Sequence, residues 1–528
     1  MKLGIDVGGT NTDAVIVSND GKLLSWSKHL TTNDIITGIE LAAKEVLKEA
    51  NIPPDQIKGI FLGTTHVLNA LYQPVNLSKT ALIRITKKPS LIEPALQWPE
   101  NLKKYISKVY HFKSSYDYTG KIKGQSMPNP DEIEQLYHDI KKYGIESICL
   151  VGAYSPLYES EERDIRDCIK ASFPEIPITM SHEIGSTGFI ERENATLLNA
   201  IISKVIRQAM IDLSTLFEKL SLECPCWLTQ NDGSLMEIQE AIDYPILTIG
   251  SGFTNSIRGA SILSGMDRCI VVDVGGSTID IGKIQNGQPE VSIGSTSILD
   301  IDVNMRVPKM YSLPYGGGSL ISIEEEVVQI KETIASDIEQ QGISWGGDTW
   351  TLTDSFLKVY PDSFSDEKIT LKGLDKLSDD DCQKVIKTVT GEIKKKISRL
   401  QPSNEALPVV LVGGGSSLLV NRLFGKYQKF FHPAGFHICN AVGACFAPLS
   451  AQVDKVFWLR DKTKQEIIDE EREQLVQQLF LKGAKRESIE LVSIEEYPFD
   501  YMKGEVLRIR LKVLGELEFI SDGDDGVV

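Results

Sequence analysis

The feature that most constrains this chain is a short hairpin motif that occurs twice. Residues 270–283, IVVDVGGSTIDIGK, read as a buried strand, an aspartate, a Gly-Gly turn with two hydroxyls, and a second strand. Residues 3–15, LGIDVGGTNTDAV, repeat the pattern, so that Asp6 corresponds to Asp273 and Asp13 to Asp280 at the same separation. One such turn is usually structural. Two copies in register predict two related domains facing each other across a cleft.

The Gly-rich turns have the composition of phosphate-binding loops. Glycine has no Cβ, so backbone N–H groups can approach phosphate oxygens closely, and neighbouring hydroxyls add further donors. Two later Gly-rich segments, one after residue 315 and one after a strand that starts near residue 408, have the same character. The candidate nucleotide-binding residues are Gly8, Gly9, Thr10, Asn11, Thr12, Gly275, Gly276, Ser277, Thr278, Gly316, Gly317, Gly318, Gly413, Gly414, Gly415 and Ser416.

The four aspartates of the two hairpins are the candidate catalytic residues. Asp6 and Asp273 each stand at a strand end just before the Gly-Gly turn, where a carboxylate would repel phosphate unless a cation lies between them. Mg²⁺ prefers oxygen ligands and keeps several of its waters, so these two residues are also the candidate metal ligands. Asp13 and Asp280 either position a nucleophile or only cap their own hairpins, and the sequence leaves both interpretations open.

The order of several further stretches gives a resemblance to a known family. The chain is similar to the hydantoinase A/oxoprolinase family, within the actin/Hsp70/sugar-kinase superfamily of ATP-handling proteins. The stretches that carry the resemblance are DVGGTNTDAV at 6–15, GTTHVLNAL at 63–71, SGFTNSIRGA at 251–260, DVGGSTIDI at 273–281, LPYGGGSLI at 313–321 and GGDTWTLTDS at 346–355.

The resemblance implies an α/β fold with two ribonuclease-H-like lobes around an ATP cleft, plus a small C-terminal region. We expect an N-terminal lobe over residues 1–187, a second lobe over 188–453 and the C-terminal region over 454–528. The ATP phosphates are then expected between the two hairpins, with Mg²⁺ at the aspartates and adenosine near Gly413–Ser416.

The function implied by the resemblance is ATP-dependent hydrolysis of a hydantoin- or 5-oxoproline-like cyclic amide, with this chain as the ATP-handling subunit. The sequence shows no Ser-His or Cys-His nucleophile signature, and the match is poor beyond about residue 455. We therefore expect a hydantoinase B-type partner subunit, and homo-oligomerisation remains open. The alternatives are a small-molecule kinase of the same superfamily and a non-enzymatic nucleotide-binding protein.

Composition excludes several other classes. The chain has 56 Lys and Arg against 73 Asp and Glu, a net charge of −17, which argues against nucleic acid or an anionic membrane as partner. The first residues enter a strand at once, without a signal-peptide pattern, and no apolar run approaches the ~20 residues of a membrane span. The eight cysteines show no zinc-binding pattern. These features favour a cytoplasmic protein with reduced thiols.

Hydrophobic periodicity and capping residues predict the main helices. Residues 87–130 show little periodicity and are expected to be loops, and residues 178–185 are expected to form a strand. Its end carries His182 and Glu183, either as ligands or as satisfied polar groups. Thr32 or Asn33 is the expected cap of the first helix. The expected helices cover residues 33–50, 131–144, 159–174, 189–220, 251–265, 323–334 and 439–453.

Overall fold

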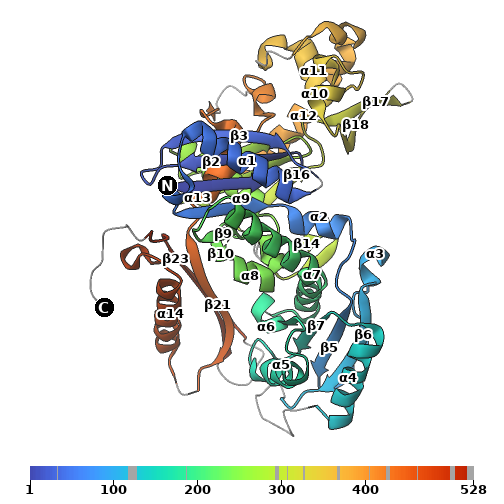
Figure 1. The fold of residues 1–528 in the computed structure, drawn as a ribbon, viewed down its shortest axis with the longest axis vertical. Helices are drawn as coiled ribbons and strands as arrows, with labels where there is room; N and C mark the ends of the chain where they lie inside the picture. The colour runs from blue at the N-terminus through green and yellow to red at the C-terminus, as the bar shows by residue number, and fades with distance from the viewer. Residues whose placement is uncertain are drawn as a thin grey trace.

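The computed structural model describes residues 1–519, apart from 33, 117–127, 186, 292–295, 306, 325–326, 365–368, 404, 424–428, 461 and 500–505. Figure 1 shows the two hairpin-bearing parts of the chain in the upper half of the molecule, with a third sheet and its helices below them. None of the described helices combines the length and apolar character needed to cross a membrane.

The first hairpin lies in a sheet with the strand order β22-β23-β21-β10-β9-β4-β1-β2-β3. β1 pairs antiparallel with β2 and parallel with β4, so the apolar run before the first Gly-Gly turn is a buried inner strand. The strands are β1 Lys2–Val7, β2 Asn11–Val17, β3 Leu23–Leu30, β4 Gly59–Thr64, β9 Cys226–Thr229, β10 Leu235–Glu237, β21 Leu449–Trp458, β22 Glu490–Pro498 and β23 Val506–Gly515.

The second hairpin lies in a sheet that repeats the arrangement around the first. β11 pairs antiparallel with β12 and parallel with β19, and β16 pairs with β12 as β3 pairs with β2. The α/β fold with two related hairpin-bearing sheets is therefore confirmed. The strands are β11 Cys269–Val274, β12 Ile279–Gln285, β13 Gln288–Pro289, β16 Met310–Leu313, β19 Val409–Val412 and β20 Phe430–Phe431.

A third sheet is parallel throughout, with the order β6-β5-β7-β8. Helices α4 (Pro130–Tyr143) and α5 (Ser160–Ser172) form a shared apolar core with it, as the lower part of Figure 1 shows. Its strands are β5 Thr80–Thr86, β6 Ile106–Lys113, β7 Ser147–Gly152 and β8 Ile178–Met180.

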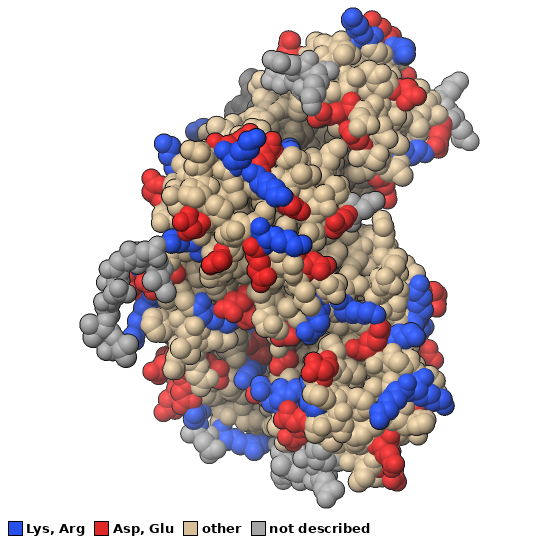
Figure 2. Space-filling model, in the orientation of Figure 1, with Lys and Arg blue, Asp and Glu red and all other residues tan. Residues whose placement is uncertain are grey.

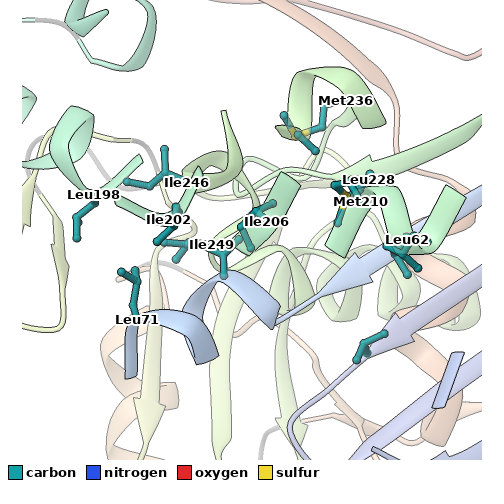
Figure 3. Packing of buried hydrophobic residues seen from close by; sticks show 14 of the residues in the cluster. Leu62, Leu71, Leu198, Ile202, Ile206, Met210, Leu228, Met236, Ile246 and Ile249 are labelled. Carbon is teal, nitrogen blue, oxygen red and sulfur yellow. The ribbon is translucent and has the colours of Figure 1, made fainter. Parts of the chain in front are cut away.

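The long helix α7 (Phe189–Lys219) joins this lower part to the first hairpin's sheet. Its apolar face packs with α1 (Ile35–Ala50) and with β1, β2 and β4 in one buried cluster. Figure 3 shows Met210 of α7 near Leu62 and Leu228, and Ile202 and Ile206 near Ile246 and Ile249. The remaining helices are α2 His66–Tyr72, α3 Glu100–Lys103, α6 Ser181–Ile184, α8 Ile238–Asp243, α9 Ser251–Ser264, α10 Ile338–Gln341, α11 Leu352–Val359, α12 Asp379–Leu400, α13 Cys439–Cys445 and α14 Lys464–Leu481.

One predicted helix is wrong and another is too long. Residues 323–324 and 327–334 contribute to a hairpin of β17 (Ser319–Glu324) and β18 (Val327–Ile334), where β-branched residues suit a half-exposed sheet. The predicted helix 439–453 ends at Cys445, because Pro448 cannot continue it, and the chain turns into β21. A further two-stranded ladder joins β14 (Thr296–Ile298) to β15 (Ile301–Val303).

Three smaller predictions also need correction. The segment 87–130 contains α3 and β6 within its described part. Strand β8 stops at Met180, and His182 lies in α6, where its Nδ1 contacts the Glu162 carboxylate at 2.6 Å while its Nε2 is buried without a hydrogen-bond partner among the described residues. Asp34 caps α1 through the Ile36 N–H, in place of Thr32, and Asn33 lies outside the described residues.

The division of the chain at residues 187 and 453 remains a proposal. Strands β9 and β10 lie in one sheet with β1–β4, although they follow residue 188. Strands β21, β22 and β23 extend the same sheet, so most of the region from 454 onward is built onto the N-terminal lobe.

Candidate active site

The tips of the two hairpins meet. A Cβ added at Gly276 would lie 2.8 Å from Thr10 Oγ1, and one added at Gly9 would lie 3.9 Å from Ser277 Oγ. A side chain in place of Gly276 would therefore push the two turns apart. The first hairpin belongs to one sheet and the second to another, so this contact brings together two turns that the sequence separates widely.

The later Gly-rich segments both dock on the second hairpin. Gly317 and Gly318 donate backbone hydrogen bonds to the carbonyls of Gly275 (3.0 Å) and Gly276 (2.8 Å). Gly415 donates to Val274 O at 2.9 Å. The segments 316–318 and 413–416 are thus held beside the turn at 275–278, as a nucleotide site requires.

The four aspartates form two matching rows across neighbouring strands. In the first sheet, Asp6 of β1 lies opposite Asp13 of β2, which lies opposite Lys28 of β3. In the second, Asp273 of β11 lies opposite Asp280 of β12. Directly opposed residues of an antiparallel pair point to the same face, so each hairpin presents a pair of carboxylates on one face.

Each strand-end aspartate lies over a glycine of the neighbouring parallel strand. A Cβ at Gly63 of β4 would overlap the Asp6 carboxylate, and one at Gly413, just after β19, would overlap that of Asp273. Gly413 also has a φ of +86°, which other residues adopt with strain. Both positions therefore require glycine if the carboxylates are to keep their place.

Helices α9 and α13 connect the two rows. Asn440 of α13 donates from Nδ2 to Asp6 Oδ2 at 3.2 Å, and its Oδ1 lies 2.6 Å from Ser256 Oγ of α9. Ser256 Oγ also lies within hydrogen-bond distance of Asp273 Oδ2. The backbones of the two helices are in direct contact at Gly259 and Gly443. A Cβ atom added at either glycine would overlap the facing helix. A chain of polar contacts thus runs from one hairpin to the other.

The carboxylates of the site are electrostatically suited to bind a cation. Burial raises the pKa of Asp6 to about 7, with the charge of Asp13 adding to the effect, and burial raises the pKa of Asp273 to about 6. Among the described residues, Asp6 Oδ1 and Asp280 Oδ1 are buried without a hydrogen-bond partner. Such acceptors are costly to bury and are stabilised by a bound cation.

Mg²⁺ fits this donor set. The described residues contain no cluster of three or more His, Cys, Asp or Glu side chains that could hold a metal by themselves. Mg²⁺ in nucleotide sites is usually held by one or two carboxylates together with water and phosphate oxygens. Asp6 and Asp273 match that pattern.

The second aspartate of each hairpin has a different environment. Asp13 forms an ion pair with Lys28, which opposes the rise in its pKa that burial causes. Asp280 accepts a hydrogen bond from Thr278 Oγ1 at 3.1 Å, and burial raises its pKa. The sequence alone could not distinguish these two residues.

Most of the predicted nucleotide-binding residues are grouped at the hairpin tips, but Thr12 faces elsewhere. Its hydroxyl is buried and lies 3.2 Å from Thr31 Oγ1, on the α1 side of the sheet. Ser416 donates to Gly413 O at 2.7 Å and therefore stabilises its own turn.

An apolar cavity of about 610 Å³ lies outside this acidic site. Ile36, Leu62, Thr64 and Met210 line it, between the start of α1, the end of β4 and the middle of α7. Leu62 and Thr64 are in register with Ile5 and Val7, whose side chains point away from the face that carries Asp6. The cavity is on the opposite side of the sheet from the carboxylates.

Sequence reasoning missed Lys28, Ser256 and Asn440. Ser256 lies within the stretch SGFTNSIRGA, which carried the family resemblance. The sequence therefore pointed to this segment but did not indicate what Ser256 contacts. Lys28 and Asn440 have no local motif. Lys28 becomes visible only once β3 is placed in register with β2, and Asn440 only once α13 packs on α9.

Comparison with known proteins agrees with this geometry. Residues 2–173 match the family model described as the hydantoinase/oxoprolinase N-terminal region, and residues 192–453 match the model described as hydantoinase/oxoprolinase. Caprolactamase subunit alpha of Pseudomonas jessenii is 22% identical over 342 residues, which are 61% of this chain and 49% of that protein. The chain thus spans about half the length of this curated relative.

Two solved structures share the fold over nearly the whole chain. The ATP-dependent caprolactamase from Pseudomonas jessenii superposes with a TM-score of 0.76 at 17% identity, covering 98% of this chain and 88% of that one. A nucleotide-free acetone carboxylase structure gives a TM-score of 0.72 at 16% identity, with the same coverage of each chain.

Proposed function

The chain belongs to the hydantoinase/oxoprolinase family, and from that premise we propose that it is the ATP-handling subunit of an enzyme that hydrolyses a cyclic amide. The observation that carries the proposal is the meeting of two Gly-Gly hairpins, each with a pair of carboxylates behind its turn, buried in the first hairpin and partly exposed in the second. The similarity to a caprolactamase subunit points to the same substrate class, a lactam or related ring.

In this proposal the ATP phosphates lie between the hairpin tips, and adenosine lies towards Gly413–Ser416. Backbone N–H groups of the two turns bind the phosphate oxygens. Mg²⁺, when bound, would neutralise phosphate charge. Asp6 and Asp273 would hold it, mostly through water, while Asn440 and Ser256 keep the two carboxylates oriented.

The hairpin acids would orient the phosphoryl acceptor. A planar amide resists hydrolysis at neutral pH, and phosphorylation of its oxygen makes the ring carbon electrophilic enough for attack by water. Phosphoryl transfer depends mainly on positioning and charge stabilisation. Asp280 is better suited than Asp13 to orient the acceptor, because one of its oxygens has no partner among the described residues, whereas Asp13 is paired with Lys28.

A partner subunit would supply the hydrolytic step. The described residues include a Ser–His contact, Ser416 Oγ to His432 Nε2 at 3.0 Å, but the Ser416 hydroxyl donates to Gly413 O and is not free to act as a nucleophile. We place the protein in the cytoplasm with reduced cysteines. Homo-oligomerisation remains open.

The deciding experiment is a substrate screen with Mg·ATP that measures both free phosphate and ring-opened product. It is run on this chain alone and together with a hydantoinase B-type protein supplied as a separate chain. We expect ATP binding by the lone chain and ring opening only with the partner. Robust ring opening by the lone chain would contradict the proposed division of labour.

The two alternatives give different products in the same screen. A small-molecule kinase would accumulate a stable phosphorylated acceptor without ring opening. A non-enzymatic nucleotide-binding protein would bind Mg·ATP and turn over nothing, with or without the partner. Asp273→Asn is the control, because any genuine turnover at this site must fall in that variant.

A further inference from the structure

The two hairpin rows differ at their third position. In the first sheet the row runs Asp6–Asp13–Lys28, and in the second it runs Asp273–Asp280–Ser312, because Ser312 of β16 lies opposite Asp280 as Lys28 lies opposite Asp13. One row therefore ends in a cation and the other in a neutral hydroxyl.

This difference shows that a hairpin carboxylate can be held at the second position without a lysine opposite it. Burial raises the pKa of both Asp280 and Asp13, yet Asp280 is partly exposed and accepts a hydrogen bond from the neutral Thr278 hydroxyl. If the third position served only to compensate the second aspartate, a hydroxyl would be enough in both sheets. Lys28 supplies a full positive charge at a place where its counterpart supplies none.

Lys28 is also placed to act beyond its own hairpin. Its ammonium group forms an ion pair with Asp13, and its charge reaches Asp273 of the opposite hairpin, where it favours the ionised carboxylate. It likewise disfavours protonation of His437, which lies just before α13. The Lys28 side chain is about a quarter exposed (27%), so the ammonium can exchange a carboxylate contact for one to a ligand.

We propose that Lys28 is a phosphate-binding residue whose ammonium group contacts the terminal phosphate of a nucleoside triphosphate held between the two hairpins. The assignment rests on the nucleotide site proposed above and adds a residue to it. Lysine binds phosphate as a flexible point charge, and a long, partly exposed side chain paired with Asp13 suits that task.

The test is calorimetric binding of Mg·AMPPNP, a non-hydrolysable triphosphate, and of Mg·ADP. For Lys28→Met we expect affinity for Mg·AMPPNP to fall about 10- to 100-fold, the scale of one charge-assisted hydrogen bond. Affinity for Mg·ADP should fall by no more than about 3-fold, because the terminal phosphate is missing. Lys28→Arg should recover most of the triphosphate affinity.

Lys22→Met is the matched control, since Lys22 is an exposed lysine on the turn between β2 and β3. It should leave both affinities unchanged. Equal affinities of wild type and Lys28→Met for Mg·AMPPNP would overturn the role of Lys28 alone. Failure of the wild-type chain to bind either nucleotide would overturn the nucleotide site itself, so the two failures are distinguishable.

A double variant separates phosphate binding from compensation of Asp13. If Lys28 only neutralises Asp13, then Asp13→Asn combined with Lys28→Met removes the problem and restores Mg·AMPPNP affinity to near the wild-type value. If Lys28 binds phosphate, affinity stays low in the double variant. Thermal melting without nucleotide is measured in parallel, and recovery of stability without recovery of affinity supports the proposal.

Discussion

At the scale of single residues, the site is defined by buried charges held in place by glycines. Asp6 and Asp273 keep raised pKa values because water is excluded from them, and Gly63 and Gly413 leave the space that their carboxylates occupy. Without a cation these residues destabilise the protein, which is common at sites built for ligands.

Asp273→Asn should leave the fold intact and lower ATP turnover by about 10²-fold, the scale of one lost electrostatic contact in a transition state. Asn retains the shape and the contact with Ser256 but removes the charge. Turnover with saturating Mg·ATP, in the presence of the partner, is the measurement. Asp6→Asn should act similarly, and the double variant should lose far less than the product of the two effects if both residues hold one ion.

The opposing interpretation makes these aspartates turn formers that bind local N–H groups. It predicts a lower melting temperature and near-normal turnover by the folded fraction. Melting curves of Asp273→Asn with and without Mg·ATP decide between them. A variant that loses stability but keeps its full nucleotide-dependent stabilisation would exclude the metal role.

At the scale of secondary-structure elements, the contact between α9 and α13 determines whether the two rows stay connected. Gly443→Ala should destabilise the protein by about 3 kcal/mol or more, because the added methyl overlaps the carbonyl of Asn255 and neither backbone can easily move. Nucleotide affinity should fall as well, since Ser256 and Asn440 lie on these helices.

Gly391→Ala is the matched control for that change. Gly391 lies on α12 with open space around its Cβ position, so alanine should be neutral or stabilise the helix by up to ~1 kcal/mol. Chemical denaturation of both variants is the measurement. Equal stabilities of Gly443→Ala and wild type would show that the helices can separate without cost.

A second element-scale prediction concerns the ion pair between Lys512 of β23 and Asp232, which lies in the turn between β9 and β10, at 2.7 Å. Burial alone would raise the pKa of Asp232, but Lys512 and the donors of Ser234 outweigh it and hold that pKa below its usual value. Lys512→Met should cost about 3 kcal/mol at pH 7, because it leaves a buried carboxylate without its cation.

The cost should depend on pH with a definite sign. A carboxyl group whose pKa is lower in the folded than in the unfolded state adds stability above the unfolded value, near 4, and that stability is lost as the pH falls through the folded value. The difference between wild type and Lys512→Met should therefore shrink from about pH 5 downward. A difference that grows on acidification would contradict this assignment.

At the scale of the whole molecule, the C-terminal strands are part of the N-terminal lobe. Residues of α14, β21 and β23 share one buried cluster with Phe61 of β4 and Trp227 of β9. Figure 1 shows the C-terminal strands, in red, beside the first sheet, although the chain reaches them last. The strands from the two ends of the chain thus belong to one open sheet, joined through β9 and β10.

A chain ended at residue 453 should therefore fail to fold or should melt far below the full chain, since it exposes that apolar cluster. Solubility and melting temperature are the measurements, and supplying residues 454–528 as a separate chain should partly restore both. A stable truncated protein with normal nucleotide affinity would show that the region is an independent appendage.

On the face shown in Figure 2, acidic and basic side chains are interspersed rather than gathered into one basic surface. Among the described residues on this face, no extended basic surface of the kind that binds nucleic acid is seen.

The sequence by itself determined the two hairpins, their aspartates and the family, because these features are local: a strand, a turn and a second strand lie within fifteen residues and repeat. It also predicted the long helix α7. It misassigned 323–334, whose described residues belong to the local hairpin of β17 and β18, and 446–453, where the chain turns into β21 and pairs with the distant strand β23.

Only the tertiary structure decided which groups meet. Asp13 and Asp280 are equivalent in sequence, yet one is paired with Lys28 and the other keeps an unpartnered oxygen, because strands β3 and β16 place different residues opposite them. The tertiary structure likewise decided the contacts of Ser256 and Asn440. These two residues join the carboxylate rows because α9 and α13, which are distant in sequence, pack against each other. Register and helix packing are long-range properties, and no local pattern encodes them.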